Sequence, residues 1–268
     1  MDIQGKVFVV TGGGSGIGRE VVLTLLRRGA RVDALDLRQD GLDETARLAG
    51  AQASDLVGHQ VDVSDSAALQ AAVDKIIAGR GTVDGVLNVA AIIQHFVTVA
   101  DLSEDEMQKV MAVNFWGPVH LTKALLPHLL SRPEACVVNV SSMGALAPVP
   151  GQTIYGASKA AIKLFTEGLY AELRDTPVQV TVVFPGAVAT DIASNSDAAV
   201  PGRSADSPAA AKITTAVDAA EQIVAGIEKG SYRVVIGNDA RMLDRLSRLA
   251  PQRATDMIAK KMASLLGS

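Results

Sequence analysis

The sequence predicts a single α/β domain in which helices cover both faces of a doubly wound parallel sheet. Short apolar runs typical of strands alternate with longer segments of helical apolar periodicity, and this alternation is typical of parallel sheets with helical crossovers. The chain has 268 residues, of which 48% are hydrophobic and 20% charged, enough to build a substantial core. We find no internal repeat and no linker that would divide it.

The elements can be placed along the chain from these patterns. The segments Arg19–Arg28 and Thr153–Arg174 have the periodicity of amphipathic helices. Crossovers between parallel strands are right-handed, and ligands of such sheets bind beyond the carboxyl ends of the strands. The expected strands are Lys6–Thr11, Arg31–Asp36, Leu56–Asp62, Gly85–Val89, Ala135–Val140, Pro177–Phe184 and Tyr232–Ile236.

A glycine-rich turn follows the first strand, with the sequence Gly12-Gly13-Gly14-Ser15-Gly16-Ile17-Gly18. Glycines allow the backbone to approach a phosphate closely, and the helix that follows presents free N–H groups and the positive end of its dipole. A flexible loop would share this composition, but the strand–turn–helix context favours a pyrophosphate site.

Three side chains have the spacing that carbonyl chemistry requires. Tyr155 and Lys159 lie one helical turn apart, so both project from the same face of the expected helix. A phenol has a pKa of about 10 in water, and a fixed ammonium nearby favours its phenolate. Ser142 follows a strand, where its hydroxyl can orient a substrate oxygen. Taken alone, the Tyr-x3-Lys pair also fits a solvated Lys beside a half-buried Tyr.

Together, Thr11-Gly-x3-Gly-Ile-Gly18, Ser142 and Tyr155-x3-Lys159 resemble the short-chain dehydrogenase/reductase family over almost the whole chain. Further landmarks of the family fall in order at Asp62-Val63, Asn88-x-Ala90, Asn114 and Pro185-Gly186-x-Val188-x-Thr190. The resemblance implies one Rossmann-type domain and an NAD(P)-dependent enzyme of class EC 1.1.1.-. Its catalytic tetrad falls on Asn114, Ser142, Tyr155 and Lys159.

The resemblance also implies a nicotinamide dinucleotide at the carboxyl edge of the sheet. Asp62 is expected to accept a hydrogen bond from the adenine amino group, and Thr190 to contact the carboxamide. The family usually has Asn-Asn-Ala-Gly after the fourth strand, whereas Ala91 here adds a methyl group near the ribose. The expected cofactor-binding residues are Gly12, Gly14, Ser15, Gly16, Ile17, Gly18, Asp36, Asp62, Val63, Asn88, Ala90, Tyr155, Lys159, Pro185, Gly186, Val188 and Thr190.

Asp36 favours NAD over NADP. It ends the second strand at close to the separation of roughly 20 residues expected for the acid that binds a ribose 2′-hydroxyl. A carboxylate there repels a 2′-phosphate, and Arg38 is better explained as a solvated loop residue than as a phosphate ligand. Asp33, inside the same strand, must be paired if it is buried, because an isolated buried charge is costly.

The implied reaction is hydride transfer that interconverts a secondary alcohol and a ketone. Tyr155 exchanges the proton of the substrate oxygen, Ser142 bonds that oxygen, Lys159 lowers the phenol pKa and binds ribose hydroxyls, and Asn114 kinks its helix and holds a water. Two alternatives stay open: an NADPH-dependent 3-oxoacyl-type ketoreductase, and a non-catalytic NAD-binding sensor or scaffold. The complete tetrad favours an enzyme, and Asp36 argues against NADPH.

The substrate is a small alcohol or ketone whose identity the sequence does not reveal. Residues after Ser142 and after the fourth strand predict a mainly apolar pocket, which suits a hydrocarbon body. Residues 191–212 contain much Ala, Ser and Asp and are expected to form a lid. The candidate substrate contacts are His95, Ser142, Gly144, Leu146 and Tyr155.

The C-terminal segment departs from family members that end soon after the last strand. We place the domain at residues 1–238 and a helical extension of it at residues 239–268. Its basic residues permit a reversible anchor on an anionic membrane, but interspersed acidic residues favour packing against the lid or a second subunit. Two amphipathic helices separated by Pro251 are predicted from the spacing of Met242, Leu246 and Leu249, and of Ile258, Met262 and Leu265.

The remaining features limit the cellular setting and the partners. The net charge of −4 gives no general attraction to nucleic acid, and the four His residues lack metal-ligand spacing, so no metal site is expected. A lone Cys and the absence of a signal peptide or membrane-spanning run favour the cytoplasm. Because the family usually assembles through its long helices, we expect a homodimer or homotetramer.

Overall fold

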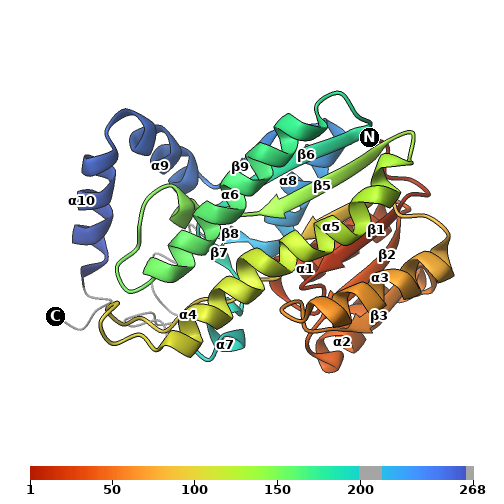
Figure 1. Cartoon of the computed structure of the whole chain (residues 1–268), viewed down its shortest axis with the longest axis horizontal. Coiled ribbons are helices and arrows are strands. Elements are labelled where there is room, and N and C mark those ends of the chain that lie inside the picture. The colour runs from red at the N-terminus through yellow and green to blue at the C-terminus, as the bar shows by residue number, and fades with distance from the viewer. Residues whose placement is uncertain (199–212, 264–268) are drawn as a thin grey trace.

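The computed structural model describes residues 1–198 and 213–263 and shows one parallel sheet flanked by helices (Figure 1). The sheet has seven strands in the order β3-β2-β1-β4-β5-β6-β9, which confirms the predicted doubly wound fold. The strand order reverses at β1, and a crevice for ligands opens at such a point. The strands are β1 (Val7–Thr11), β2 (Arg31–Asp36), β3 (Leu56–Gln60), β4 (Gly85–Asn88), β5 (Ala135–Val140), β6 (Val178–Pro185) and β9 (Arg233–Ile236).

Two hydrophobic cores lie on opposite faces of the sheet. Strand β1 supplies both, because Phe8 and Val10 point to one face while Val7 and Val9 point to the other. This is why buried parallel strands are apolar throughout rather than alternating. In Figure 1, α5 and α6 cross in front of the sheet. The first core is covered by α1 (Gly16–Arg27), α2 (Gln39–Ala49) and α8 (Ala216–Glu228), and the second by α3 (Ser66–Arg80), α5 (Gly117–Leu130) and α6 (Thr153–Leu173).

Several predicted boundaries differ from the structure by a few residues. Strand β3 ends at Gln60 and not at Asp62, and β4 ends at Asn88 and not at Val89, so the site residues Asp62 and Ala90 lie on loops. Helix α1 begins at Gly16, earlier than the predicted start. The end of the glycine motif therefore forms the first turn of the helix, and its free N–H groups open directly onto the turn.

A π-helical turn at Ala112–Trp116 joins α4 (Glu104–Met111) to α5, with Asn114 buried within it. Such turns bend a helix and recur at functional sites. The short helices η1 (Gly50–Asp55) and η3 (Met143–Ala145) follow α2 and β5. A small second sheet pairs β7 (Val188–Ala189) with β8 (Thr214–Thr215), and α7 (Ile192–Asn195) follows β7. The rest of the expected lid, residues 199–212, lies outside the described part of the chain.

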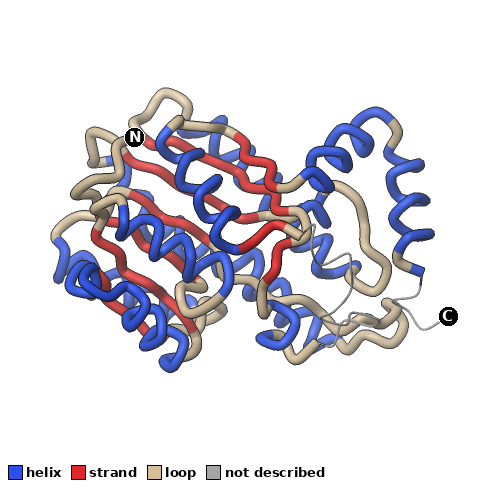
Figure 2. Tube along the Cα trace, turned by 180° about the vertical axis from the view of Figure 1, so that it is seen from behind, coloured by secondary structure: helices blue, strands red, loops and turns tan. Residues whose placement is uncertain are grey.

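The C-terminal segment forms two helices, α9 (Asn238–Leu249) and α10 (Pro251–Lys261), which stand beside one end of the sheet (Figure 2). Pro251 begins α10, as the sequence indicates. The predicted apolar face of α9 is wrong at two of its three residues, because Met242 and Leu249 are 53% and 86% exposed, whereas Leu246 packs against the core that contains the buried Leu243. Met242 and Leu243 are adjacent and both apolar, so the sequence allows either to face the core, and tertiary packing buries Leu243. Leu265 lies beyond the described residues.

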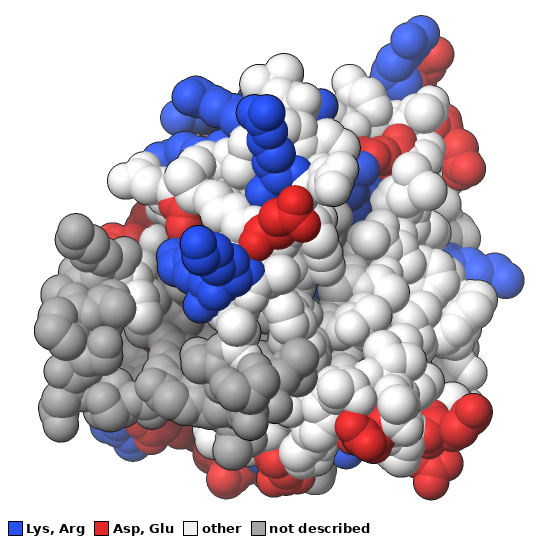
Figure 3. All heavy atoms as spheres, turned by 90° about the vertical axis from the view of Figure 1, so that its left-hand side faces the viewer, with Lys and Arg blue, Asp and Glu red and all other residues white. Residues whose placement is uncertain are grey.

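Helices α9 and α10 cover the loop that follows β5. Leu243, Ala254 and Ile258 form a small core with Ala147 of that loop. Figure 3 faces this side of the molecule and shows basic side chains beside acidic ones and broad uncharged areas. Within residues 1–198 and 213–263, no helix has the length and apolarity needed to cross a membrane.

The buried carboxylate of Asp33 has two side-chain partners. Its carboxylate accepts a 2.7 Å hydrogen bond from Nε of Arg80 and lies 2.7 Å from Nε2 of His59. Arg80 also donates to the carbonyl oxygens of Val32 and Asp55. Arg80 therefore ties the end of α3 to the edge of the sheet that carries β2 and β3.

Arg80→Met should destabilise the fold by about 3 kcal/mol, because it leaves Asp33 buried without its permanent cation. Urea unfolding followed by circular dichroism measures the loss. The control is Arg47→Met, which removes an exposed pair with Glu44 and should leave the midpoint nearly unchanged. Equal midpoints for the two variants would contradict the role given to Arg80.

Candidate active site

A cavity of about 710 Å³ runs along the carboxyl edge of the sheet. The sheet order places the end of β2, with Asp36, on one side of the glycine turn and the ends of β4 and β5 on the other. The cavity therefore passes from Asp36 across the turn to Ser142 and Tyr155. The predicted site residues that line it are Gly12, Ser15, Gly16, Ile17, Gly18, Asp36, Asp62, Val63, Ala90, His95, Ser142, Tyr155, Lys159, Pro185, Gly186, Val188 and Thr190.

The glycine turn is packed too closely to accept side chains. A Cβ at Gly18 would lie 2.1 Å from the carbonyl oxygen of Gly12, and Gly12 and Gly16 have positive φ angles of 71° and 51°. The backbone N–H of Gly14 donates to Oδ2 of Asp36 at 2.9 Å. Asp36 therefore holds the turn in shape as well as facing the cavity.

These features fit a dinucleotide. The turn presents backbone and the start of α1 to the cavity, which suits a pyrophosphate. Oδ1 of Asp36 already accepts from the N–H of Arg38 at 3.0 Å, and its carboxylate retains lone pairs for ribose hydroxyls. Asp62 accepts from both the N–H and the hydroxyl of Ser64, which fixes its carboxylate at the cavity wall.

Ser142, Tyr155 and Lys159 come together at the far end of the cavity. Nζ of Lys159 lies 6.0 Å from the ring centre of Tyr155 and donates to the carbonyl oxygen of Val140 at 3.0 Å. Burial raises the pKa of Tyr155, and a hydrogen bond with the Ser142 hydroxyl partly offsets this rise. Burial also lowers the pKa of Lys159 to about 8. The three groups therefore lie together and face the cavity.

Asn114 does not line the cavity. Its side chain accepts from the N–H of Ile92 and donates to the carbonyl oxygen of Ile92, both at 2.9 Å, and it donates to Oγ of Ser158 at 3.0 Å. Asn114 therefore connects the loop after β4 to helix α6, beside Lys159. Asn88 is likewise buried, and its amide donates to Thr122 and Asn139.

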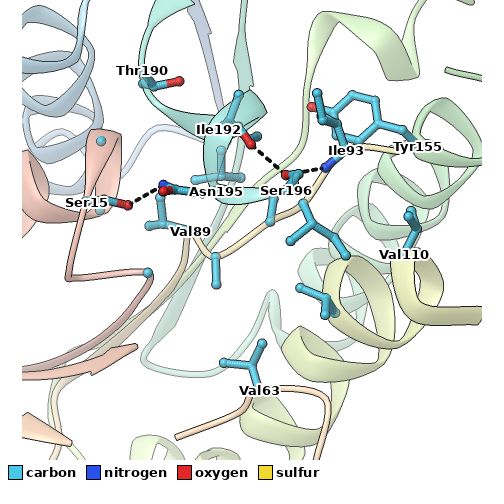
Figure 4. A pocket seen from close by; sticks show the side chains of 18 of the residues that line it. Ser15, Val63, Val89, Ile93, Val110, Tyr155, Thr190, Ile192, Asn195 and Ser196 are labelled. Carbon is cyan, nitrogen blue, oxygen red and sulfur yellow. Dashed lines mark hydrogen bonds between the residues drawn. The ribbon is translucent and has the colours of Figure 1, made fainter. Parts of the chain in front are cut away.

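Helix α7 lies across the cavity and is hydrogen-bonded on both sides (Figure 4). Asn195 donates to Oγ of Ser15 at 3.1 Å, and Oγ of Ser196 accepts from the N–H of Ile93 at 3.0 Å. His95 also lines the cavity, paired with Glu106 at 2.8 Å. Among the described residues, the predicted positions Gly14, Asn88, Gly144 and Leu146 do not line it.

Sequence reasoning missed several residues that shape the site. Asp239 accepts from the N–H of Ala187, and its carboxylate fills the space that a side chain at Gly186 would need. Arg19 donates to the carbonyl oxygen of Gly14 and to Thr45, fixing the glycine turn from behind. Oε1 of Gln94 accepts hydrogen bonds from the N–H groups of Ile154 and Tyr155 at the start of α6. Apart from the Arg19–Gly14 bond, which lies within the turn region, these contacts join segments at least 26 residues apart, so no local spacing in the sequence signals them.

Comparisons with known proteins identify the family of this chain. Residues 6–201 match the family model described as short chain dehydrogenase. A protein named as the oxidoreductase SadH, from Mycobacterium tuberculosis, is 37% identical over 97% of this chain and 96% of its own length. The rat dehydrogenase/reductase SDR family member 7B is 35% identical over 72% of this chain and 61% of its own length.

Solved structures show the same fold. A short-chain dehydrogenase/reductase from Burkholderia phymatum, in complex with NAD, has a TM-score of 0.84 and 26% identity, with 95% of this chain and 97% of that chain covered. A short-chain dehydrogenase from Burkholderia cenocepacia, in complex with NADP, has a TM-score of 0.79 and 26% identity, with 96% and 99% covered. With the family model, the relatives and the fold in agreement, the chain belongs to the short-chain dehydrogenase/reductase family of oxidoreductases.

Proposed function

We propose that this protein is an NAD-dependent oxidoreductase that interconverts a secondary alcohol and a ketone. The observation that carries the proposal is the meeting of Ser142, Tyr155 and Lys159 at one end of a cavity whose other end holds Asp36 against a glycine turn. The first group suits proton exchange with a substrate oxygen, and the second suits a dinucleotide.

Each side chain of the cluster has a distinct task. When bound, the nicotinamide accepts or supplies the hydride. The Tyr155 phenolate takes the alcohol proton, and the Ser142 hydroxyl holds the same oxygen in place. Burial favours the neutral phenol, so the nearby positive charge of Lys159 is needed to form the phenolate. Asn114 acts indirectly by fixing the segment that contains Lys159 against the loop after β4.

The pocket walls support a substrate with an apolar body. Ile92, Ile93, Val110 and Val113 line the cavity together with the His95–Glu106 pair. The apolar residues suit hydrocarbon, and the pair can hydrogen-bond a polar group at the opposite end of the substrate. A 3-oxoacyl substrate is the second candidate, since the 3-ketoacyl-(acyl-carrier-protein) reductase of Brucella melitensis, complexed with NADH, matches the fold with a TM-score of 0.77 at 25% identity.

The expected homodimer or homotetramer is also part of this proposal. Large apolar side chains are exposed on the π-turn and on α6: Trp116 by 48%, Leu164 by 67% and Tyr170 by 39%. Exposed apolar side chains on long helices are consistent with association through those helices. We further propose that residues 239–268 act as part of the same domain, because α9 and α10 pack against the loop after Ser142.

The function is tested by following NADH formation from NAD with secondary alcohols of increasing hydrocarbon size. The reverse reaction is followed with ketones and a 3-oxoacyl thioester, using NADH or NADPH. Turnover of alcohols with NAD supports the proposal, and turnover confined to the thioester with NADPH supports the ketoreductase. Binding of NADH without turnover of any compound would support a sensor or scaffold.

Tyr155→Phe should lower kcat by a factor of about 10² or more while leaving NADH affinity within twofold, because it removes only the oxygen that exchanges the proton. Steady-state kinetics and NADH fluorescence titration measure the two effects. Substantial turnover by this variant would show that another group carries the proton.

Asp36→Ala should move cofactor preference towards NADP, because it removes the carboxylate that repels a 2′-phosphate while Arg38 remains. The KM for NAD should also rise, since the N–H of Gly14 loses its acceptor. The measurement is the ratio of kcat/KM for the two cofactors before and after the change. A wild-type protein that already prefers NADP would refute the role of Asp36.

Lys159→Met should stabilise the fold at pH 7 by about 1–3 kcal/mol, because the buried ammonium is costly. The folded-state pKa is lowered from 10.5 to about 8, so the unfolded chain binds this proton more tightly. Below pH 8 the cost is full, and it shrinks as the pH rises from 8 to 10.5. Urea unfolding at pH 7 and pH 10 should therefore show a gain that falls at the higher pH, and an equal gain at both would contradict this account.

A further inference from the structure

Gln94 is a buried residue for which the proposed reaction has no use. It follows Ile93 on the loop after β4, and its side chain is inaccessible to solvent. Its Oε1 accepts from the backbone N–H of Ile154 at 2.8 Å and from that of Tyr155 at 3.0 Å. Its own carbonyl oxygen accepts from Nε2 of Gln152 at 2.6 Å. The Gln94 side chain thus accepts two hydrogen bonds from the first turn of α6, the helix that carries Tyr155.

The start of α6 would otherwise lack these partners. The first N–H groups of a helix have no intrahelical acceptor, and a local Ser, Thr, Asp or Asn usually supplies one. Here the N-cap residue is Gln152, whose side chain makes no capping bond. The acceptor comes instead from Gln94, far away in the sequence.

We propose that Gln94 is a positioning residue for Tyr155, which it holds at a set distance from the substrate wall by capping α6 from the loop after β4. This loop also supplies Ile92 and Ile93 to the cavity wall. Asn114 holds Ile92 in place, and Gln94 holds the start of α6 in place. The loop after β4 therefore determines the position of the cavity wall and also the position of the Tyr155 phenol. Displacing a reacting group by about 1 Å can lower turnover by about 10²-fold.

The Gln94 side chain that caps α6 is uncharged, and its charge can be changed without removing its acceptor oxygen. A Glu at position 94 would accept from the same two N–H groups but add a negative charge near the phenol, which raises a phenol pKa. The cavity that Tyr155 lines also has other charged or titratable groups. They are Lys159 on the same helix, Asp36, Arg38 and Asp62 at the cofactor end, His95 on the loop, Asp105, Glu106 and Lys109 on α4, and Asp191 and Asp197 on either side of α7. All of them are unchanged in this variant.

The experiment compares Gln94→Glu, Gln94→Met and the control Gln152→Met, which loses a bond to the same loop but keeps both helix N–H groups capped. Gln94→Met should lower kcat about tenfold or more with NADH affinity within twofold. Gln94→Glu should shift the rise of oxidative kcat with pH upward by about half a unit to one unit. Gln152→Met should keep the wild-type pH profile.

The inference rests on the proposed role of Tyr155, so one measurement is made independent of turnover. Tyrosinate absorbance is titrated, and the component missing in Tyr155→Phe is assigned to Tyr155. An upward shift of that component in Gln94→Glu supports the cap even if no substrate is turned over, in which case only the proposed function fails. An unshifted titration and pH profile in Gln94→Glu, or wild-type kcat in folded Gln94→Met, would overturn the role of Gln94. The Glu variant decides the question if the Met variant does not fold.

Discussion

The pairing of β1 with both β2 and β4 is the constraint on which the whole site depends. The three strands are parallel, so the loops that follow them meet at the carboxyl edge of the sheet. Because β2 and β4 lie on opposite sides of β1, the loops after β1 and β4 diverge and leave a crevice between them. The crevice left between them needs a support. Oγ of Thr11 provides it by accepting from the N–H groups of Val89 and Ala90 at 3.0 and 3.1 Å, which holds the loop after β4 beside the glycine turn.

The parts of the fold that were predictable from sequence are those whose cause is local. The glycine turn follows from backbone freedom at adjacent positions, and the Tyr155–Lys159 pair follows from one turn of helix. Asp239 and Gln94 could not be found in this way, because each completes its bonds with a segment far along the chain. The phase of α9 was also undetermined, since Met242 and Leu243 are both apolar and only tertiary packing decides which one is buried. The observed ends of β3 and β4 differ from the predicted ends for a similar reason, because a strand ends where its neighbour no longer pairs with it and not at a particular residue type.

The site is assembled largely from buried polar groups, which is an expensive way to build a protein interior. Asn114, Gln94 and Lys159 are all nearly inaccessible to solvent. Each has hydrogen-bond partners among backbone groups of other segments, which offset part of the desolvation and fix relative positions, while Nε2 of Gln94 is buried without a partner among the described residues. Such networks define one arrangement of the loops more sharply than apolar contacts could, because hydrogen bonds depend on direction.

The two hydrogen bonds that hold α7 across the cavity also determine how easily the cavity can be opened. Lifting α7 requires breaking the Asn195–Ser15 and Ser196–Ile93 contacts, and each contributes only about 1 kcal/mol net. None of the residues of α7 is buried, so little apolar surface is exposed when it moves. Among the described residues, α7 is therefore held by weaker contacts than the buried groups Asn114, Gln94 and Lys159. An opening of this cost is compatible with exchange of ligands on the microsecond to millisecond timescale of enzyme loops.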